Sequence, residues 1–282
     1  MFTRPYGNTG IHLSVAGFGG IICMEEKPED ASRFVKEAVE GGVNYFDIAP
    51  SYGNAQEILG PALEPFRKSV FLACKTGERG AAKAEEELNE SLRHMRTDHF
   101  DLYQFHGITT LEEVEQILGP GGAMETFEKA KRDGKVRYLG FSAHSEEAAL
   151  AMMDNYDFTS ILFPINWVTW NIGKFGPRVV ERASEKGLAI LALKSLAKRK
   201  WEEGEEKKWW KAWYAPVDSY EEAELALRFT LSRPVTAAVS PSHMELLRWA
   251  IRAADNFSPL TEKEEKDLAE RSKSLAAIFP AA

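Results

Sequence analysis

The sequence has 282 residues, of which 44% are hydrophobic, so the chain is long and apolar enough to bury a large core. This composition excludes intrinsic disorder. The 35 Lys and Arg residues face 43 Asp and Glu residues, and the formal net charge of -8 argues against a nucleic-acid-binding surface.

The cysteine content and the N-terminus indicate the compartment. Cys23 and Cys74 are too few for a disulfide framework or a four-thiolate metal site, so we expect no metal cofactor. Residues 1–10 lack the apolar core of a signal peptide, and the longest nearly apolar run, Val15–Met24, contains three glycines and is too short to cross a bilayer. We therefore expect a cytoplasmic protein with no membrane partner.

In chain order, the sequence predicts a hairpin and then eight strands. The hairpin covers residues 1–14, with a turn at Gly7–Gly10. The strands are short apolar runs at Val15–Gly17, Val43–Phe46, Val70–Ala73, Phe100–Phe105, Tyr138–Phe141, Ile161–Pro164, Ala189–Leu193 and Thr236–Val239.

Each predicted strand is followed by a segment with helical spacing. In the first one, Ala31, Val35 and Val39 share an apolar face, and Gly41-Gly42 ends the helix. The others are predicted at Ala55–Phe66, Ala81–Met95, Leu111–Arg132 with a break at Gly119–Gly122, Glu146–Asn155, Pro177–Lys186, Tyr220–Ser232, His243–Asp255 and, beyond the eighth unit, Glu262–Ile278.

Eight βα units in about 250 residues predict an α/β fold of the (β/α)8 TIM-barrel type. We expect a single domain, residues 1–282, with an N-terminal β-hairpin and an extra C-terminal helix. An open, doubly wound sheet is the alternative. Against it, Gly17-Phe18-Gly19-Gly20 after the first strand does not have the spacing of a Rossmann phosphate turn.

Four chemically active side chains follow strands two to four, where a barrel places its active site. Asp47 ends the second strand and Tyr52 lies on the same loop, while Lys75 and His106 follow the third and fourth strands. A phenol can protonate a developing alkoxide, and a nearby ammonium favours the phenolate. The quartet therefore predicts reduction of a carbonyl group.

Each member of the quartet also has a simpler explanation when it is taken alone. Asp47 suits a helix cap or a turn, and Tyr52 can cover the rim of the barrel. Lys75 suits a solvated strand end, and His106 suits a structural hydrogen bond. Their shared position at successive strand ends favours the catalytic interpretation.

The chain resembles the aldo-keto reductases. The resemblance lies in Asn44–Gly53 (NYFDIAPSYG), Leu72–Thr76 (LACKT), Asp101–His106 (DLYQFH) and Gly134–Ser142 (GKVRYLGFS), and it extends to the N-terminal hairpin. It implies that Tyr52 is the general acid, that Lys75 lowers the pKa of Tyr52, that Asp47 orients Lys75 and that His106 places the substrate carbonyl. It also implies NAD(P)H as the hydride donor, without a metal.

Residues after the later strands are candidates for binding this cofactor. Ser142 and Asn166 are expected to bind the nicotinamide carboxamide, and Lys194 the pyrophosphate. Ser142 also suits a helix cap, Asn166 a turn and Lys194 an exposed side chain. Ala143 and Leu193 depart from the family pattern, which has an Asn and an aromatic ring at these two places.

The last predicted strand is followed by residues that suit the adenosine end of the cofactor. Ser242 and Arg248 are expected near the 2′-phosphate, at a helix N-terminus. The basic pattern of the family is incomplete here, yet we expect NADP(H) to be used rather than NAD(H).

Tryptophans are frequent in two segments of the second half. Trp167 and Trp170 are expected to line the substrate pocket. The Trp-rich segment 201–214 predicts either a lid over the site or an amphipathic helix packed on the barrel. We expect most of its tryptophans to be packed.

The sequence thus predicts a reductase that converts an aldehyde or a ketone to the alcohol. One alternative is a regulatory protein that keeps the barrel and the nicotinamide site with little turnover. Another is a lyase that forms a Schiff base through Lys75. The physiological substrate and the oligomeric state are not indicated by the sequence.

Overall fold

The computed structural model describes residues 1–279, and its centre is a closed barrel of eight parallel strands in the order β12-β3-β4-β5-β6-β7-β8-β9. The predicted (β/α)8 fold is therefore confirmed, and the open sheet is excluded. The barrel strands are β3 (Ala16–Gly19), β4 (Tyr45–Asp47), β5 (Phe71–Thr76), β6 (Phe100–Ile108), β7 (Val136–Ala143), β8 (Ser160–Pro164), β9 (Ala189–Leu193) and β12 (Ala237–Val239).

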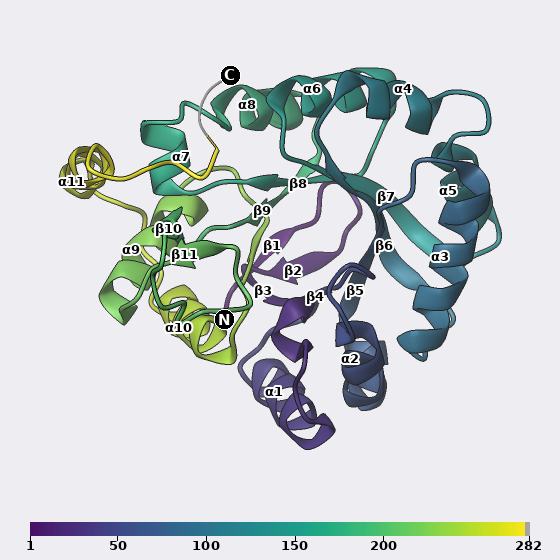
Figure 1. Cartoon of the computed structure of the whole chain (residues 1–282), viewed down its shortest axis with the longest axis horizontal. Helices are drawn as coiled ribbons and strands as arrows, with labels where there is room; N and C mark the ends of the chain where they lie inside the picture. The colour runs from purple at the N-terminus through teal and green to yellow at the C-terminus, as the bar shows by residue number, and fades with distance from the viewer. Residues whose placement is uncertain (280–282) are drawn as a thin grey trace.

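Helices surround this barrel (Figure 1) and pack their apolar faces against it. They are α1 (Pro28–Glu40), α2 (Ala55–Leu63), α3 (Ala81–His94), α4 (Leu111–Leu118), α5 (Ala123–Arg132), α6 (Glu146–Asn155), α7 (Trp167–Asn171), α8 (Pro177–Glu185), α9 (Tyr220–Leu231), α10 (Met244–Asp255) and α11 (Glu262–Ser272), with 3-10 turns η1 (Gly20–Cys23) and η2 (Glu64–Ser69). None of the helices within residues 1–279 is both long and apolar enough to cross a membrane.

Two predicted helices are shorter in the structure. The segment predicted at Ala55–Phe66 changes from α2 to η2 at Glu64, because Pro65 has no N–H to continue the helical ladder. The last helix ends at Ser272 rather than at Ile278. Ile278 instead packs against Ala197 and Tyr214 of the segment that follows β9, and this burial draws the chain away from the helix axis.

The N-terminal hairpin closes the end of the barrel at which the strands begin, called the lower end below. Its strands β1 (Thr3–Pro5) and β2 (His12–Ser14) are antiparallel, as the sequence predicts, and they lie across the centre of the ring in Figure 1. Tyr6 is fully buried, donates a hydrogen bond to Ser160 Oγ (2.8 Å) and packs against Phe71 and Tyr138. Chemistry is thereby left to the opposite end, where the βα loops lie.

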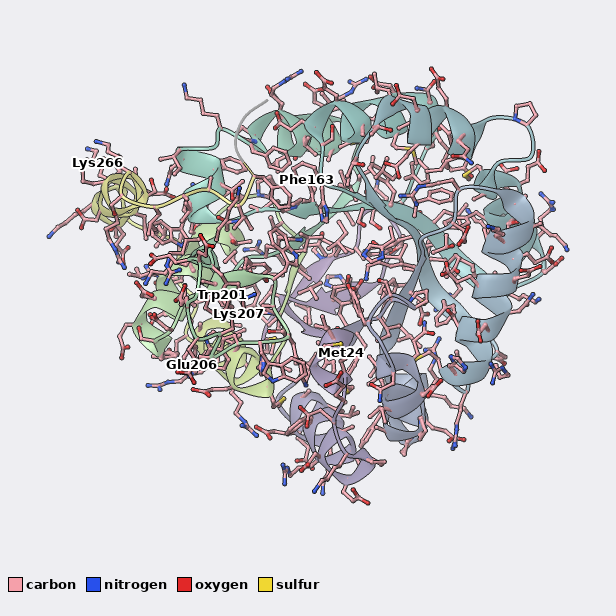
Figure 2. All side chains as sticks on the ribbon, in the orientation of Figure 1. Met24, Phe163, Trp201, Glu206, Lys207 and Lys266 are labelled. Carbon is pink, nitrogen blue, oxygen red and sulfur yellow. The ribbon has the colours of Figure 1, made fainter. Side chains whose placement is uncertain are left out.

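The Trp-rich segment after β9 is a hairpin and not a helix, so the amphipathic-helix prediction is wrong. Strands β10 (Ala197–Lys200) and β11 (Tyr214–Pro216) are antiparallel, and the residues between them are turns. Arg199 binds both carboxylate oxygens of Glu205, and Trp201 Nε1 donates to Ala212 O (2.8 Å). These contacts fold residues 201–213 as a compact loop, on which Figure 2 labels Trp201, Glu206 and Lys207.

Candidate active site

The carboxyl ends of the strands enclose a cavity of about 180 Å³. Tyr52, Lys75 and His106 line it on the side of β4 to β6, while Lys194 and Ser242 line it on the side of β9 and β12. Pockets that enclose a drug-sized ligand measure about 300–1,000 Å³. The cavity is therefore large enough for a small reacting group, and a dinucleotide has to extend from it along the rim.

Lys75 connects the candidate acid to a buried carboxylate. Its Nζ forms an ion pair with Asp47 Oδ1, donates to Ile48 O (3.2 Å) and lies 3.5 Å from Tyr52 Oη. The side chains of Lys75 and Asp47 are 1% and 3% exposed. The structure thus brings together three of the four residues expected from the sequence, with Lys75 between the other two.

The second oxygen of Asp47 is held from the interior of the barrel. Oδ2 accepts hydrogen bonds from Tyr45 Oη (3.2 Å) and Gln104 Nε2 (3.1 Å). Because two strands fix this carboxylate, its charge stays directed at Lys75. Gln104 is not among the site residues expected from the sequence, so its contact with Asp47 is an addition from the structure.

His106 completes the group beside Tyr52. The two rings meet edge to face with centroids 6.0 Å apart, and His106 Nδ1 lies 3.4 Å from Ser51 Oγ. Burial, together with the nearby Lys75 cation, lowers the pKa of His106 to about 2. The imidazole is therefore neutral at physiological pH, and one ring nitrogen can donate a hydrogen bond without carrying charge.

Burial and the neighbouring charges act in opposite directions on the pKa values of Lys75 and Tyr52. Burial opposes the ammonium form of Lys75, but Asp47 outweighs it and the pKa of Lys75 is raised. Burial raises the pKa of Tyr52, and the attraction of Lys75 for the phenolate offsets this only in part. Lys75 thus lowers the pKa of Tyr52, in the direction that the resemblance implies, while burial has the larger and opposite effect.

The two residues expected at the nicotinamide carboxamide are buried just outside the cavity lining. Ser142 Oγ accepts from Gly107 N (2.8 Å), which ties β7 to the end of β6. Asn166 Oδ1 caps α7 by accepting from Val168 N and Thr169 N. Asn166 Nδ2 is buried and has no hydrogen-bond partner among the described residues.

The residues expected at the adenosine end separate in the structure. Ser242 lines the cavity, and its Oγ lies 2.8 Å from His243 Nδ1 at the start of α10. Arg248 does not line the cavity. Its guanidinium forms a bidentate pair with Glu37 of α1, at 2.6 and 2.8 Å.

The pocket aromatics are not the ones expected. Trp167 is buried beneath α11, and Trp170 packs against Phe229, so neither lines the cavity. Both belong to α7, whose apolar side faces the outer helices. Trp213 and Tyr214 line the cavity instead, because the β10–β11 hairpin brings them to its mouth.

Sequence reasoning also missed His144, which follows Ala143 at the end of β7. Lys194 Nζ lies 3.2 Å from His144 Nε2, and both residues line the cavity. His144 lies three residues beyond the predicted strand Tyr138–Phe141, so the available signal was a titratable side chain in the loop after a strand, the kind of signal that identified Lys75 and His106. Phe279, far along the chain, also packs against His144, and no sequence pattern indicates this contact.

Comparison with known proteins agrees with the fold. The profile described as the Aldo/keto reductase family matches residues 17–273. The chain is 28% identical to YqkF, an uncharacterised oxidoreductase of Bacillus subtilis, over 305 aligned positions that cover 97% of each protein. It is 29% identical to the L-galactose dehydrogenase of Arabidopsis thaliana over 154 residues, which cover 49% of this chain and 47% of that protein.

A solved structure shows the same architecture. The holo form of an aldo-keto reductase from Bacillus halodurans superposes with a TM-score of 0.76 at 25% identity and covers 99% of this chain and 98% of that one. The members of this family act on small carbonyl compounds. Because the family profile spans most of the sequence, the chain belongs to the aldo/keto reductase family and is an NAD(P)H-dependent oxidoreductase.

Proposed function

We propose that the protein reduces an aldehyde or a ketone to the alcohol and that Tyr52 donates the proton. The observation that carries this proposal is the position of Tyr52 Oη, 3.5 Å from Lys75 Nζ in a cavity that His106 also lines. A proton donor, a fixed cation and a neutral hydrogen-bond donor thus face one small space.

In this mechanism each residue acts on the carbonyl oxygen or on Tyr52. His106 donates a hydrogen bond that holds the carbonyl oxygen near Tyr52 Oη. Tyr52 transfers its proton to that oxygen and is left as a phenolate. Lys75 stabilises the phenolate, and Asp47 keeps Lys75 charged and directed at it. When bound, the reduced nicotinamide supplies the hydride to the carbonyl carbon.

The rim offers groups that fit this cofactor. The unpartnered Asn166 Nδ2 suits the carboxamide oxygen of the nicotinamide, and Ser142 lies on the neighbouring strand. Ser242 and the N-terminus of α10 suit a phosphate, because the first N–H groups of a helix lack intrahelical acceptors. These assignments are supported by position and by the donors that the structure leaves open.

We propose NADPH as the preferred cofactor, with Arg248 binding the 2′-phosphate. In the structure the Arg248 guanidinium is paired with the carboxylate of Glu37, so the phosphate has to displace Glu37 in order to bind. Replacement of Glu37 by Gln should therefore tighten NADPH binding several-fold and leave NADH binding unchanged. Fluorescence titration with both cofactors measures this. Equal effects on both cofactors would remove Arg248 from the assignment.

The buried ion pair also bears on the lyase alternative. A Schiff base needs a neutral amine, and Asp47 holds the pKa of Lys75 above its ordinary value. Lys75 therefore suits the support of a phenolate better than nucleophilic attack.

The proposal is tested by Tyr52→Phe, which removes the hydroxyl and keeps the ring. Steady-state oxidation of NADPH should be followed with a panel of simple aldehydes. We expect kcat to fall by about 10²–10⁴ with cofactor affinity unchanged, which is the range for loss of a general acid. A variant that turns over at the wild-type rate would refute the assignment of Tyr52. Wild-type protein that binds cofactor and reduces no carbonyl compound would favour the regulatory alternative.

A further inference from the structure

We propose that Lys194 and His144 form a binding site for a carboxylate carried by the carbonyl substrate, so that the enzyme prefers aldehyde acids or keto acids. This inference rests on the proposed function and names the class of its substrate.

The first observation is a buried cation without an acidic partner. Lys194 is 9% exposed and lines the cavity. Within residues 1–279 no carboxylate lies within ion-pair distance of its Nζ, which contacts His144 Nε2 at 3.2 Å. The rings of Trp213 and Phe279 lie 5.4 and 5.5 Å from the same nitrogen. Aromatic faces support a cation only in part, so the ammonium is left to be neutralised by a ligand.

The second observation is the direction of the Lys194 side chain. In TIM barrels the usual phosphate site lies between the loops of the seventh and eighth strands, here β9 and β12. Lys194 follows β9, but its amine reaches His144 at the end of β7, on the side away from β12. The ammonium thus points toward the catalytic side, and we revise the sequence-based assignment of Lys194 to the pyrophosphate.

His144 in turn adjoins the catalytic loop. A Cβ built on Gly107, the residue after His106, would lie 3.9 Å from the His144 ring. Lys194, His144 and His106 therefore follow one another along the rim, and a ligand that contacts the first two can place its carbonyl near the third. The neutral imidazole of His144 adds a second hydrogen-bond partner for a carboxylate.

The charges around the cavity favour an acid over a neutral or cationic compound. Among the described lining residues, Asp47 is the one carboxylate, and it is paired with Lys75. Lys211 is paired with Glu26 at 2.6 Å. Lys194 is thus the lining lysine whose charge no described residue balances, and a carboxylate supplies the missing charge.

The backbone at Lys194 is consistent with a functional position. Its φ of 62° lies in the left-handed region, which residues other than glycine rarely adopt. Such strain persists where the surrounding structure enforces it and clusters at binding sites.

The test compares 4-carboxybenzaldehyde with its neutral amide, 4-carbamoylbenzaldehyde. For the wild type at pH 6.5 we expect kcat/KM to be about tenfold or more higher for the acid than for the amide, because only the acid can form a charge-assisted hydrogen bond with Lys194. Lys194→Met should reduce that preference to near unity, chiefly through KM, and Lys194→Arg should restore part of it. Lys207→Met, an exposed substitution of the same kind in the β10–β11 loop, should leave the preference unchanged.

A binding measurement separates this inference from the proposed function. Calorimetric titration of the NADP⁺-saturated protein should detect benzoate and not benzamide, and Lys194→Met should abolish the benzoate signal. If that holds while no aldehyde is reduced, the carboxylate site stands and the proposed function fails. Equal losses for both aldehydes with weakened NADPH binding would assign Lys194 to the cofactor and overturn the inference. An unchanged preference in Lys194→Met would also overturn it.

Discussion

At the scale of single residues, the charge of Asp47 is needed for stability because it balances the buried charge of Lys75. Its carboxylate is buried, and Lys75 loses its counter-charge when Asp47 is neutralised. Asp47→Asn should lower the free energy of unfolding by about 3 kcal/mol, because a single charge left buried is strongly unfavourable. Urea denaturation measures this. The control is Asp157→Asn at a fully exposed carboxylate, which should change stability by less than about 0.5 kcal/mol. Equal effects would contradict the account.

Lys194 lowers the free energy of unfolding by an amount that depends on pH, because its buried ammonium has no acidic partner among the described residues. Burial, with the Lys75 charge nearby, lowers the pKa of Lys194 to about 7. The unfolded chain therefore binds more protons between pH 7 and about pH 10, and wild-type stability rises through this window. Lys194→Met should be more stable than the wild type at pH 6, by on the order of 3 kcal/mol. This gain should shrink toward pH 10.

Denaturation midpoints at pH 6 and pH 9.5 test this dependence on pH. In the folded protein the pKa values of His144 and His106, about 3 and about 2, lie below this range, so both imidazoles stay neutral in it. In the unfolded chain they titrate at about pH 6.5 in the wild type and the variant alike, so the comparison between the two proteins reports on Lys194. Lys207→Met, at an exposed lysine, should show no such dependence. A Lys194→Met variant that is less stable at both pH values would contradict the burial of an unpaired ammonium.

The sequence predicts side chains at strand ends well and their remote partners poorly. Asp47, Lys75 and His106 could be predicted because parallel strands end at one rim and side chains alternate along each strand. The ion pair of Arg248 with Glu37 could not be predicted, because the two residues are 211 positions apart and nothing local to either one indicates the pair. Asn166 illustrates both results. It follows a predicted strand, as expected, but the cap that its Oδ1 forms on α7 was not predicted, and its Nδ2 has no partner among the described residues.

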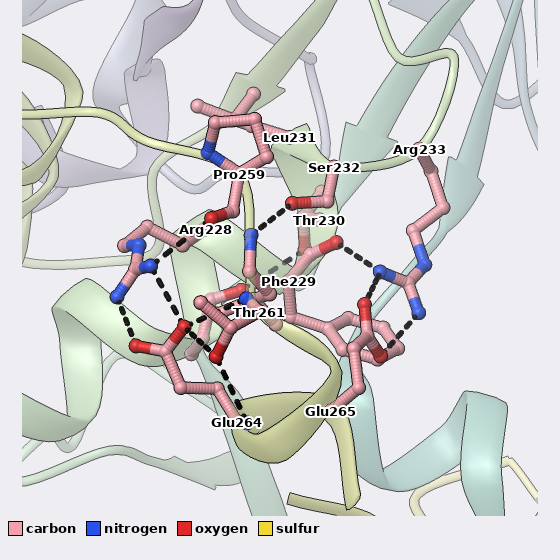
Figure 3. A network of polar contacts seen from close by, with 12 residues as sticks. Arg228, Phe229, Thr230, Leu231, Ser232, Arg233, Pro259, Thr261, Glu264 and Glu265 are labelled. Carbon is pink, nitrogen blue, oxygen red and sulfur yellow. Dashed lines mark hydrogen bonds and ion pairs between the residues drawn. The ribbon is translucent and has the colours of Figure 1, made fainter.

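At the scale of elements, ion pairs attach α11 to the outside of the barrel (Figure 3). Arg228 of α9 binds both carboxylate oxygens of Glu264, and Arg233 binds Glu265 in the same way. The hydrogen bond to Arg228, followed by bonds to Thr261 in the helix cap, lowers the pKa of Glu264 to about 2. The folded carboxylate thus titrates below its unfolded counterpart, and its contribution to stability is present above about pH 4.3 and lost as the pH falls toward 2.

Glu264→Gln should therefore destabilise the protein at pH 7 by about 1 kcal/mol, since the pair is partly exposed and screened. The difference from the wild type should decrease between pH 5 and pH 2.5. Thermal unfolding across this range measures it, with Glu262→Gln in the same helical turn as the control. A difference that is independent of pH would show that the cap, and not the charge, is what Glu264 contributes.

Helices with a clear apolar face were predicted to within a few residues, and segments decided by tertiary contacts were not. The bounds of α6 agree with the prediction because Ser145 caps its start and polar residues end it. The β10–β11 segment was misassigned because its alternation of Trp with Lys and Glu fits helical spacing. Its ion pairs and the docking of Lys211 on Ile22 O and Glu26 override that pattern.

At the scale of the whole molecule, stability and chemistry lie at opposite ends of the barrel. Tyr6 closes the lower end of the barrel, where the strands begin, and its hydrogen-bond partner Ser160 and its ring neighbours Phe71 and Tyr138 do not line the cavity. Tyr6→Ala should cost about 3–5 kcal/mol of stability, as truncation of a buried aromatic does, with cofactor affinity unchanged. Chemical denaturation and cofactor titration check the two parts. Phe2→Ala, at a 38% exposed ring, should cost far less. Loss of cofactor binding in folded Tyr6→Ala would contradict the separation of the two ends.

The most direct test of the whole account is a single-turnover transfer of deuterium. Reduced nicotinamide cofactor that carries deuterium at both C4 positions is mixed with excess enzyme and an aldehyde, and the alcohol is analysed by mass spectrometry over time. We predict one deuterium on the former carbonyl carbon with the wild type. With Tyr52→Phe, which should bind the cofactor equally well, we predict the same product at a rate about 10²–10⁴ lower. Deuterium in the product at equal rates from both proteins, or an alcohol without deuterium, would contradict the account.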